Sequence, residues 1–236
     1  MSKLQLHRRT PQNPKGNLLY LMGATWKTKS MFDLDSDQES FCQILNNNGI
    51  ETFAFDIPET SHDDVLNITF ELIETHNIKN VMGYSYGCIT AFDAAFRYKL
   101  DNVILLDPFS GTQIKNEEFD THYEYNTSDV KTTIDEVCSI PESVKECYLS
   151  SLGGSKFNSP KYPKLKSRES YNTYTSRDAF DTLQGRLTVN FTDCVKQEVY
   201  EKYSMLNPTM YNSSHWILLE SGRQELAKNV LTLIRH

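Results

Sequence analysis

The chain has 236 residues, 39% of them hydrophobic and 23% charged, a composition typical of one folded domain rather than a disordered chain. Asp and Glu outnumber Lys and Arg by 31 to 24, and the resulting net charge of −7 argues against general nucleic-acid binding, which needs a basic surface. The apolar runs are far shorter than the ~20 residues of a membrane-spanning helix, so no membrane span is predicted.

The first hundred residues alternate between short apolar segments and segments with helical periodicity. Predicted strands cover 17–22, 51–55, 80–82 and 102–106, and predicted helices cover 37–47, 63–75 and 86–98. Strands that are apolar on both faces and alternate with helices are typical of a parallel sheet covered by helices on both faces. The alternation returns near the C-terminus, with strands over 186–191 and 208–211 and a closing helix over 222–234.

Between these two parts, residues 109–183 have weak periodicity and are rich in Tyr, Asn, Ser and Lys. A stretch of this length without regular structure is uncommon inside a compact domain unless it is functional. We therefore predict a core of residues 1–108 and 184–236, with residues 109–183 inserted as a cap over an active site. A peripheral addition with no role in the site is the alternative.

The pentapeptide Gly83-Tyr84-Ser85-Tyr86-Gly87 has the pattern G-x-S-x-G and joins a predicted strand to a predicted helix. Such a sharp turn holds the serine in a strained backbone conformation with its hydroxyl exposed. Glycines at both ends allow the strand and the helix to approach closely, and the helix N-terminus directs N–H groups toward the serine. The pattern predicts a nucleophile at Ser85; a tight turn with an incidental serine is the alternative.

This motif, in this setting, resembles the nucleophile elbow of the α/β-hydrolase family, whose catalytic residues follow the chain order serine, acid, histidine. The resemblance covers nearly the whole chain. It implies an α/β fold with a mainly parallel sheet, helices on both faces, and a cap or lid inserted at 109–183.

A serine hydroxyl becomes a good nucleophile when a base takes its proton. Of the six histidines, only His215 follows the last predicted strand and precedes the closing helix, where the family places its base. Two aspartates end apolar strands and are candidates to orient this imidazole. Most relatives resemble the placement of Asp193, which is therefore preferred. Asp107, which also suits an Asp-Pro turn with Pro108, is the alternative acid.

The resemblance also implies two backbone N–H donors that stabilise an oxyanion. One belongs to Tyr86, the residue after the nucleophile. The other belongs to the loop after the first strand, where Ala24 is preferred and Thr25 is the alternative. Met22 stands in this loop where family members often have histidine, but the donor is a backbone group and survives the change.

No nucleotide-binding motif and no metal-ligand spacing is present, so neither a cofactor nor a metal is predicted. The five cysteines are odd in number and scattered, which favours neither a disulfide framework nor a zinc site. The first 14 residues lack the apolar stretch of a signal peptide. We expect a cytoplasmic protein, and the sequence does not define its oligomeric state.

Taken with the resemblance, these residues predict a serine hydrolase that cleaves a small-molecule carboxylic ester or thioester through an acyl-enzyme. Two alternatives stay open. The same triad supports lyases and acyltransferases, and a catalytically silent protein could use the pocket for binding alone.

Overall fold

The computed structural model describes residues 6–23, 28, 32, 38–56, 62–108, 124–126, 140, 142–151, 156–158 and 177–234. A seven-stranded sheet in the order β1-β3-β2-β4-β5-β8-β9 forms the centre of this part of the chain. All neighbouring strands are parallel except the edge strand β1, which is antiparallel to β3. The strands are β1 (Leu6–Arg9), β2 (Gly16–Leu21), β3 (Ile50–Phe55), β4 (Asn80–Tyr84), β5 (Asn102–Leu106), β8 (Leu187–Thr192) and β9 (Thr209–Tyr211).

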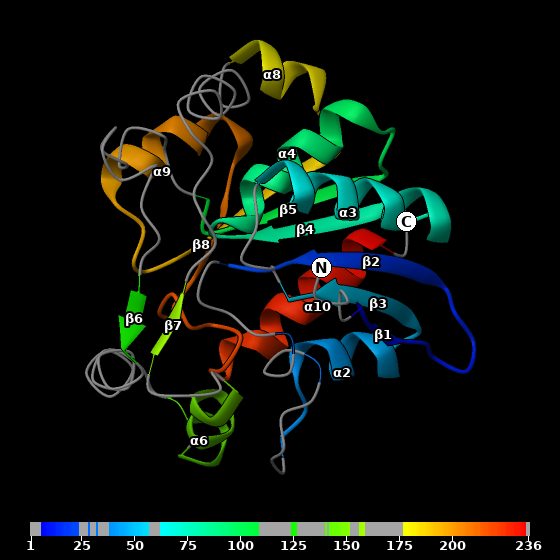
Figure 1. Ribbon diagram of the computed structural model, residues 1–236. Coiled ribbons are helices and arrows are strands. Elements are labelled where there is room, and N and C mark those ends of the chain that lie inside the picture. The colour runs from blue at the N-terminus through cyan, green and yellow to red at the C-terminus, as the bar shows by residue number, and fades with distance from the viewer. Residues whose placement is uncertain are drawn as a thin grey trace.

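Helices cover both faces of the sheet, with α3 and α4 on one side and α2 and α10 on the other (Figure 1). The helices that follow the strands are α2 (Phe41–Asn47), α3 (His62–His76), α4 (Gly87–Arg97), α9 (Gln197–Tyr203) with the short η3 (Ser204–Leu206), and α10 (Gly222–Ile234). The predicted α/β fold, a mainly parallel sheet with helices on both faces, is confirmed. Within the described part of the chain, no helix combines the length and the apolar character needed to cross a bilayer.

Strand β2 shows why both faces are covered. Successive side chains of a strand point to opposite faces, and the last four residues of β2 are all hydrophobic. Leu18 and Tyr20 pack in the core under α2 and α10, whereas Leu19 and Leu21 pack in the core under α3 and α4. All four are at most 3% exposed, so this continuous hydrophobic run forms a parallel strand that is covered on both faces.

Strand β1 is an element that the hydrophobic pattern did not predict. Its sequence is polar, and it lies at the edge of the sheet, where Arg8 pairs with Glu51 of β3 at 2.7 Å. An edge strand has one unpaired side and needs no continuous apolar run, which explains the missing signal.

The chain between β5 and β8 carries four described elements. Strands β6 (Glu124–Asn126) and β7 (Lys156–Asn158) form an antiparallel pair, and helices α6 (Glu142–Ser151) and α8 (Arg177–Thr182) lie apart from each other (Figure 1). Val144 of α6 and Phe180 of α8 are buried in the two opposite core clusters. Most of the predicted insertion at 109–183 lies outside the described residues, and its role as a cap stays a prediction.

Candidate active site

Ser85 occupies the turn between β4 and α4. Its φ angle is +50°, a left-handed conformation that non-glycine residues rarely adopt and that costs of order 1–3 kcal/mol. The Ser85 N–H donates a hydrogen bond of 2.9 Å to the carbonyl oxygen of Leu106, and the Ser85 carbonyl accepts one of 3.0 Å from Cys88. The chain is therefore held in this strained turn at the carboxyl end of the sheet.

The two glycines of the motif are required by close backbone approaches. A Cβ atom on Gly87 would lie 2.1 Å from the carbonyl oxygen of Leu21, and one on Gly83 would lie 2.6 Å from the carbonyl oxygen of Gly87. Side-chain atoms do not tolerate such distances. The first turn of α4 therefore packs directly against the end of β2, as the absence of Cβ atoms in the motif allows.

His215 lies in the loop that follows β9. Its ring packs against the ring of Tyr84, with centroids 4.9 Å apart, and the Tyr84 hydroxyl donates a hydrogen bond to the His215 carbonyl oxygen. Tyr84 is fully buried and immediately precedes Ser85 in the chain. The residue before the nucleophile thus positions the loop that carries the imidazole. Sequence reasoning missed this role, because the second position of G-x-S-x-G accepts many residues.

The carboxylate that contacts His215 belongs to Asp107, directly after β5. Asp107 Oδ2 lies 2.9 Å from His215 Nδ1, and the Asp107 side chain is only 5% exposed. Thr192 contributes two further hydrogen bonds of 2.8 Å, from its N–H to Oδ1 and from its hydroxyl to Oδ2. Asp107 also has a positive φ of +47°, so both Ser85 and Asp107 sit in strained turns.

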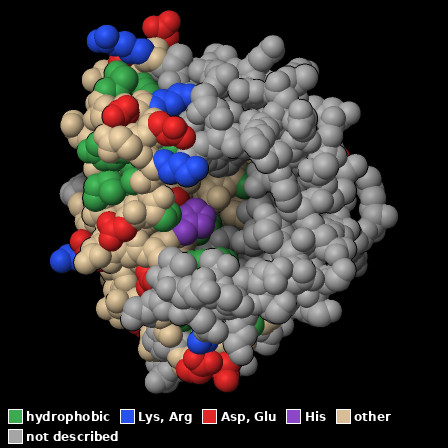
Figure 2. Space-filling model, turned by 90° about the vertical axis from the view of Figure 1, so that its left-hand side faces the viewer, with side chains coloured by type: hydrophobic (Ala, Val, Ile, Leu, Met, Phe, Trp, Pro, Cys, Tyr) green, Lys and Arg blue, Asp and Glu red, His purple; other side chains and the backbone are tan. Residues whose placement is uncertain are grey.

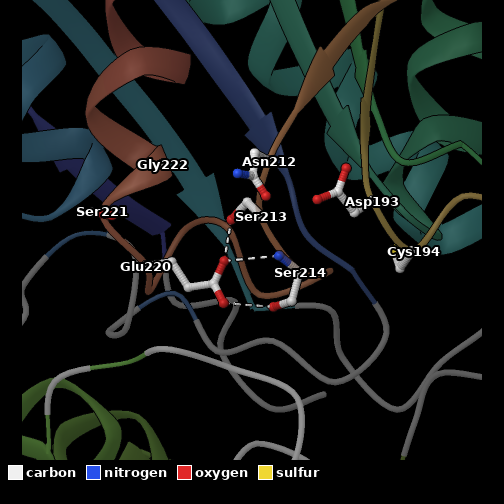
Figure 3. A pocket seen from close by; sticks show the side chains of 8 residues that line it. All are labelled: Asp193, Cys194, Asn212, Ser213, Ser214, Glu220, Ser221 and Gly222. Carbon is white, nitrogen blue, oxygen red and sulfur yellow. Dashed lines mark hydrogen bonds between the residues drawn. The ribbon is translucent and has the colours of Figure 1, made fainter.

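This geometry corrects the preference for Asp193 as the partner of His215. N–H groups of successive residues in a strand point to opposite neighbours. At the end of β8 the Thr192 N–H points to Asp107, whereas the Asp193 N–H donates to the Ser213 carbonyl oxygen at 3.0 Å. The exposed Asp193 side chain lines a separate hollow of about 410 Å³, which Asn212 also lines (Figure 3). The alternative acid, Asp107, is the one bonded to the imidazole.

The surroundings of His215 favour its protonated form. Burial alone would lower the pKa of the imidazole, but the hydrogen bonds and electrostatic interactions with Asp107 and Cys194 outweigh it and raise the pKa from 6.5 to about 9. An imidazole in this setting readily accepts a proton and is stabilised as imidazolium. The imidazole acts as a base only in its neutral form, which becomes the main form above a pH of about 9.

Ser85, Asp107 and His215 line one cavity of about 170 Å³ at the carboxyl ends of the strands. Cys194 and Lys196 also line this cavity. The rest of its wall is apolar and consists of Pro108, Phe191, Val195 and Val199. Figure 2 looks onto this side of the molecule and shows a histidine side chain at the surface beside hydrophobic side chains. The geometry provides a serine, an imidazole–carboxylate pair and a small apolar pocket in one place.

No protein-family model and no curated protein matches this sequence. Solved structures do match. The thioesterase domain from the curacin biosynthetic pathway aligns with a TM-score of 0.67 and 14% identity over 98% of this chain and 96% of that domain. The monoacylglycerol lipase of Paleococcus ferrophilus aligns with a TM-score of 0.66 and 13% identity over 98% of both chains. A soluble variant of monoglyceride lipase from Saccharomyces cerevisiae gives 0.64 and 16% over 98% and 90%.

This chain has the α/β-hydrolase fold. With identities of 16% or less, these matches establish the fold of the chain and leave its chemistry to the residues of the site.

Of the two backbone donors expected near Ser85 in this α/β-hydrolase fold, the one at Tyr86 belongs to the described residues. Tyr86 is the N-cap of the 11-residue helix α4, whose N-terminus therefore lies beside the serine. The positive end of the helix dipole favours negative charge at this point. Ala24 and Thr25, the two candidates for the second oxyanion donor, lie outside the described residues.

A buried carboxylate stabilises the loop that carries His215. Glu220 is 7% exposed and accepts hydrogen bonds from the Ser213 hydroxyl, from the Ser214 hydroxyl at 2.9 Å and from the Ser214 N–H at 2.9 Å (Figure 3). The Ser214 hydroxyl in turn accepts a hydrogen bond of 3.1 Å from the N–H of Trp216. Both neighbours of His215 are thereby tied to one network. Two serines before a histidine are a common pattern, so the sequence did not predict this hydrogen-bond network.

Cys194 lies beside the imidazole and the carboxylate. Its Sγ atom is 3.8 Å from His215 Nδ1 and 3.8 Å from Asp107 Oδ2, and 2.8 Å from the Thr192 hydroxyl. Cys194 is an exposed free thiol on the wall shared by the 170 and 410 Å³ hollows. Sequence reasoning gave it no role.

Proposed function

We propose that this protein is a serine hydrolase that cleaves a small-molecule carboxylic ester or thioester through an acyl-enzyme intermediate. One observation carries the proposal: the strained Ser85 at the β4–α4 turn opens onto the same cavity as an imidazole that is hydrogen-bonded to a buried carboxylate. This is the arrangement by which a serine alcohol is made nucleophilic.

The roles follow from the contacts. Asp107 accepts the Nδ1 proton of His215, which leaves Nε2 as the acceptor for the Ser85 hydroxyl proton. Ser85 Oγ attacks the carbonyl carbon, and the leaving alcohol or thiol departs with the proton from His215. Water then attacks the acyl-enzyme with His215 again as the base, and Ser85 is released. The Tyr86 N–H and a donor from the loop after β2, at Ala24 or Thr25, stabilise the oxyanion in both steps.

The pocket and the structural matches support this reaction class. The described wall is mainly apolar and the cavity holds about 170 Å³, which favours a short acyl group beside Ser85. The matched structures include a thioesterase domain, monoacylglycerol lipases and carboxylesterases. They also include a meta-cleavage product hydrolase, so the fold alone does not select the substrate. We propose a cytoplasmic location, since Cys42, Cys88 and Cys194 are free thiols.

A fluorophosphonate probe tests the proposal, because it labels only an activated serine. We expect one label per wild-type chain, no label on Ser85→Ala, and full labelling of the matched control Ser204→Ala, which changes an exposed serine on η3. Turnover of p-nitrophenyl acetate and of an acetyl thioester should follow the same order. A folded wild-type protein that takes no label and cleaves neither substrate would favour a silent binding protein instead.

A further inference from the structure

Three different metal-binding donor atoms meet beside the cavity. Asp107 Oδ2, Cys194 Sγ and His215 Nδ1 all lie within 4.8 Å of one another, at separations of 2.9, 3.8 and 3.8 Å. The point equidistant from the three atoms lies about 2.1 Å from each, which matches the Zn–N and Zn–O bond lengths of about 2.0–2.2 Å and is close to the Zn–S length of about 2.3 Å. An ion would thus fit with displacements of a few tenths of an ångström.

The donor set is the one that zinc prefers. Thiolate and imidazole select Zn²⁺ over Mg²⁺ and Ca²⁺, and the charges of one thiolate and one carboxylate balance the charge of the ion. The donors are already held together: the Thr192 hydroxyl lies 2.8 Å from both Asp107 Oδ2 and Cys194 Sγ, and Tyr84 fixes the backbone of His215. Cys194 is exposed, so an ion and a water as fourth ligand have access from the cavity.

We propose that Asp107, Cys194 and His215 bind Zn²⁺, and that the bound ion switches the serine off. The inhibition follows from the imidazole. A neutral imidazole carries one proton, so a His215 that binds the metal through Nδ1 must carry its proton on Nε2. That nitrogen can then no longer accept the proton of Ser85. Metal binding stands independently of the proposed hydrolase function, whereas the inhibition rests on it.

Cobalt provides a readout that needs no enzyme activity. Co²⁺ bound by a thiolate gives a charge-transfer absorption band in the near ultraviolet. We expect metal-free wild type to develop this band up to one Co²⁺ per chain and to lose it on addition of Zn²⁺. Cys194→Ser should remove the band, and the control Cys42→Ala, which removes a buried thiol outside the cluster, should keep it. An unchanged band in Cys194→Ser, or no band in wild type, would overturn the site.

Competition with a chromophoric chelator measures the zinc affinity. Loss of a residue that merely supports a metal ligand costs about 10–100-fold in affinity, so loss of the ligand itself should weaken Zn²⁺ binding at least about 100-fold in Cys194→Ser. Because Cys194 is exposed, serine at this position should leave the fold intact. Equal zinc affinity in wild type and Cys194→Ser would contradict the assignment.

The inhibitory role is tested by the ratio of activities with and without Zn²⁺ in the same variant. Zn²⁺ should lower the activity of wild type at least tenfold, and EDTA should restore it. The activity of Cys194→Ser should be nearly the same with and without Zn²⁺. Full activity of zinc-loaded wild type would refute the inhibitory role. If the metal-free enzyme cleaves no ester or thioester, the proposed function fails, and the cobalt band still decides the metal site.

Discussion

Replacement of the buried Asp107 carboxylate by an amide should greatly lower kcat. In Asp107→Asn, the side chain keeps its size and the hydrogen bond that Oδ1 accepts from the Thr192 N–H, but an amide N–H₂ can face His215 Nδ1 in place of Oδ2. The imidazole is then held with its proton on Nε2 and cannot act as the base. In a serine protease the equivalent change lowers kcat by about 10⁴, or about 5.4 kcal/mol at 1.36 kcal/mol for each factor of ten. We expect a loss of that order here.

The same substitution should change the pH dependence. Activity requires neutral His215, so in wild type kcat/KM should rise as the pH passes upward through the His215 pKa of about 9. Asp107 and Cys194 raise this pKa and burial lowers it, so removal of the Asp107 charge must move the rising limb to lower pH. The measurement is kcat/KM for an activated ester from pH 5.5 to 10 in buffer with EDTA, which excludes effects of bound metal.

Asp193→Asn is the matched control, because Asp193 also follows an apolar strand but its side chain is exposed and lines the other hollow. We expect its kcat/KM to stay within about twofold of wild type. Thermal unfolding of both variants checks that they fold. A loss in Asp193→Asn that equals the loss in Asp107→Asn, or a loss below tenfold in Asp107→Asn, would refute the assigned roles.

Three further substitutions test the supports of the site. Tyr84→Phe keeps the ring that packs on His215 but loses the hydroxyl that holds its carbonyl, so kcat should fall about tenfold with KM nearly unchanged, as steady-state kinetics can show. Glu220→Gln should lower the free energy of unfolding in urea by about 2 kcal/mol, since hydrogen bonds to a charged group contribute about 1.5–3 kcal/mol. Gly87→Ala should cost more than about 3 kcal/mol or prevent folding, whereas Gly185→Ala, with nothing within 4 Å but a φ of +78°, should cost about 1 kcal/mol.

Residues of the same types that lie outside the site provide the controls. Tyr98→Phe removes a hydroxyl that bonds Glu74 on the surface and should leave kcat unchanged. Glu225→Gln changes an exposed carboxylate on α10 and should alter the free energy of unfolding by less than about 0.5 kcal/mol. Equal effects of Tyr84→Phe and Tyr98→Phe, or of Glu220→Gln and Glu225→Gln, would contradict the positioning roles. Equal losses of unfolding free energy in Gly87→Ala and Gly185→Ala would contradict the requirement for glycine at position 87.

The fold could be predicted from the sequence because its signals are local. Apolar runs such as 102–106, followed or preceded by a helix with one apolar face, indicate a covered parallel strand. The turn at Ser85 is also a local signal, since glycines at 83 and 87 permit the backbone approaches that the structure contains. Edge strand β1 gave no such signal, because half of its environment is solvent.

The acid could not be chosen from the sequence because the choice depends on register. Asp107 and Asp193 each follow an apolar strand, and only the pairing of Leu106 with Asn190 sets the level at which β5 and β8 end. That pairing places Thr192, rather than Asp193, beside the Asp107 carboxylate. The cluster of Asp107, Cys194 and His215 is equally invisible in the sequence, because its members are 21 and 87 residues apart in the chain.

Capture of the acyl-enzyme shows directly whether Ser85 is the nucleophile. Wild-type protein would be mixed with p-nitrophenyl acetate, quenched in acid within the first turnovers, digested and mapped by mass spectrometry. We expect one acetyl group on the peptide that contains Ser85, formed at least about 10³-fold more slowly in Asp107→Asn. An acetyl group on the Cys194 peptide, or ester turnover with no acylated peptide at all, would contradict this role of Ser85.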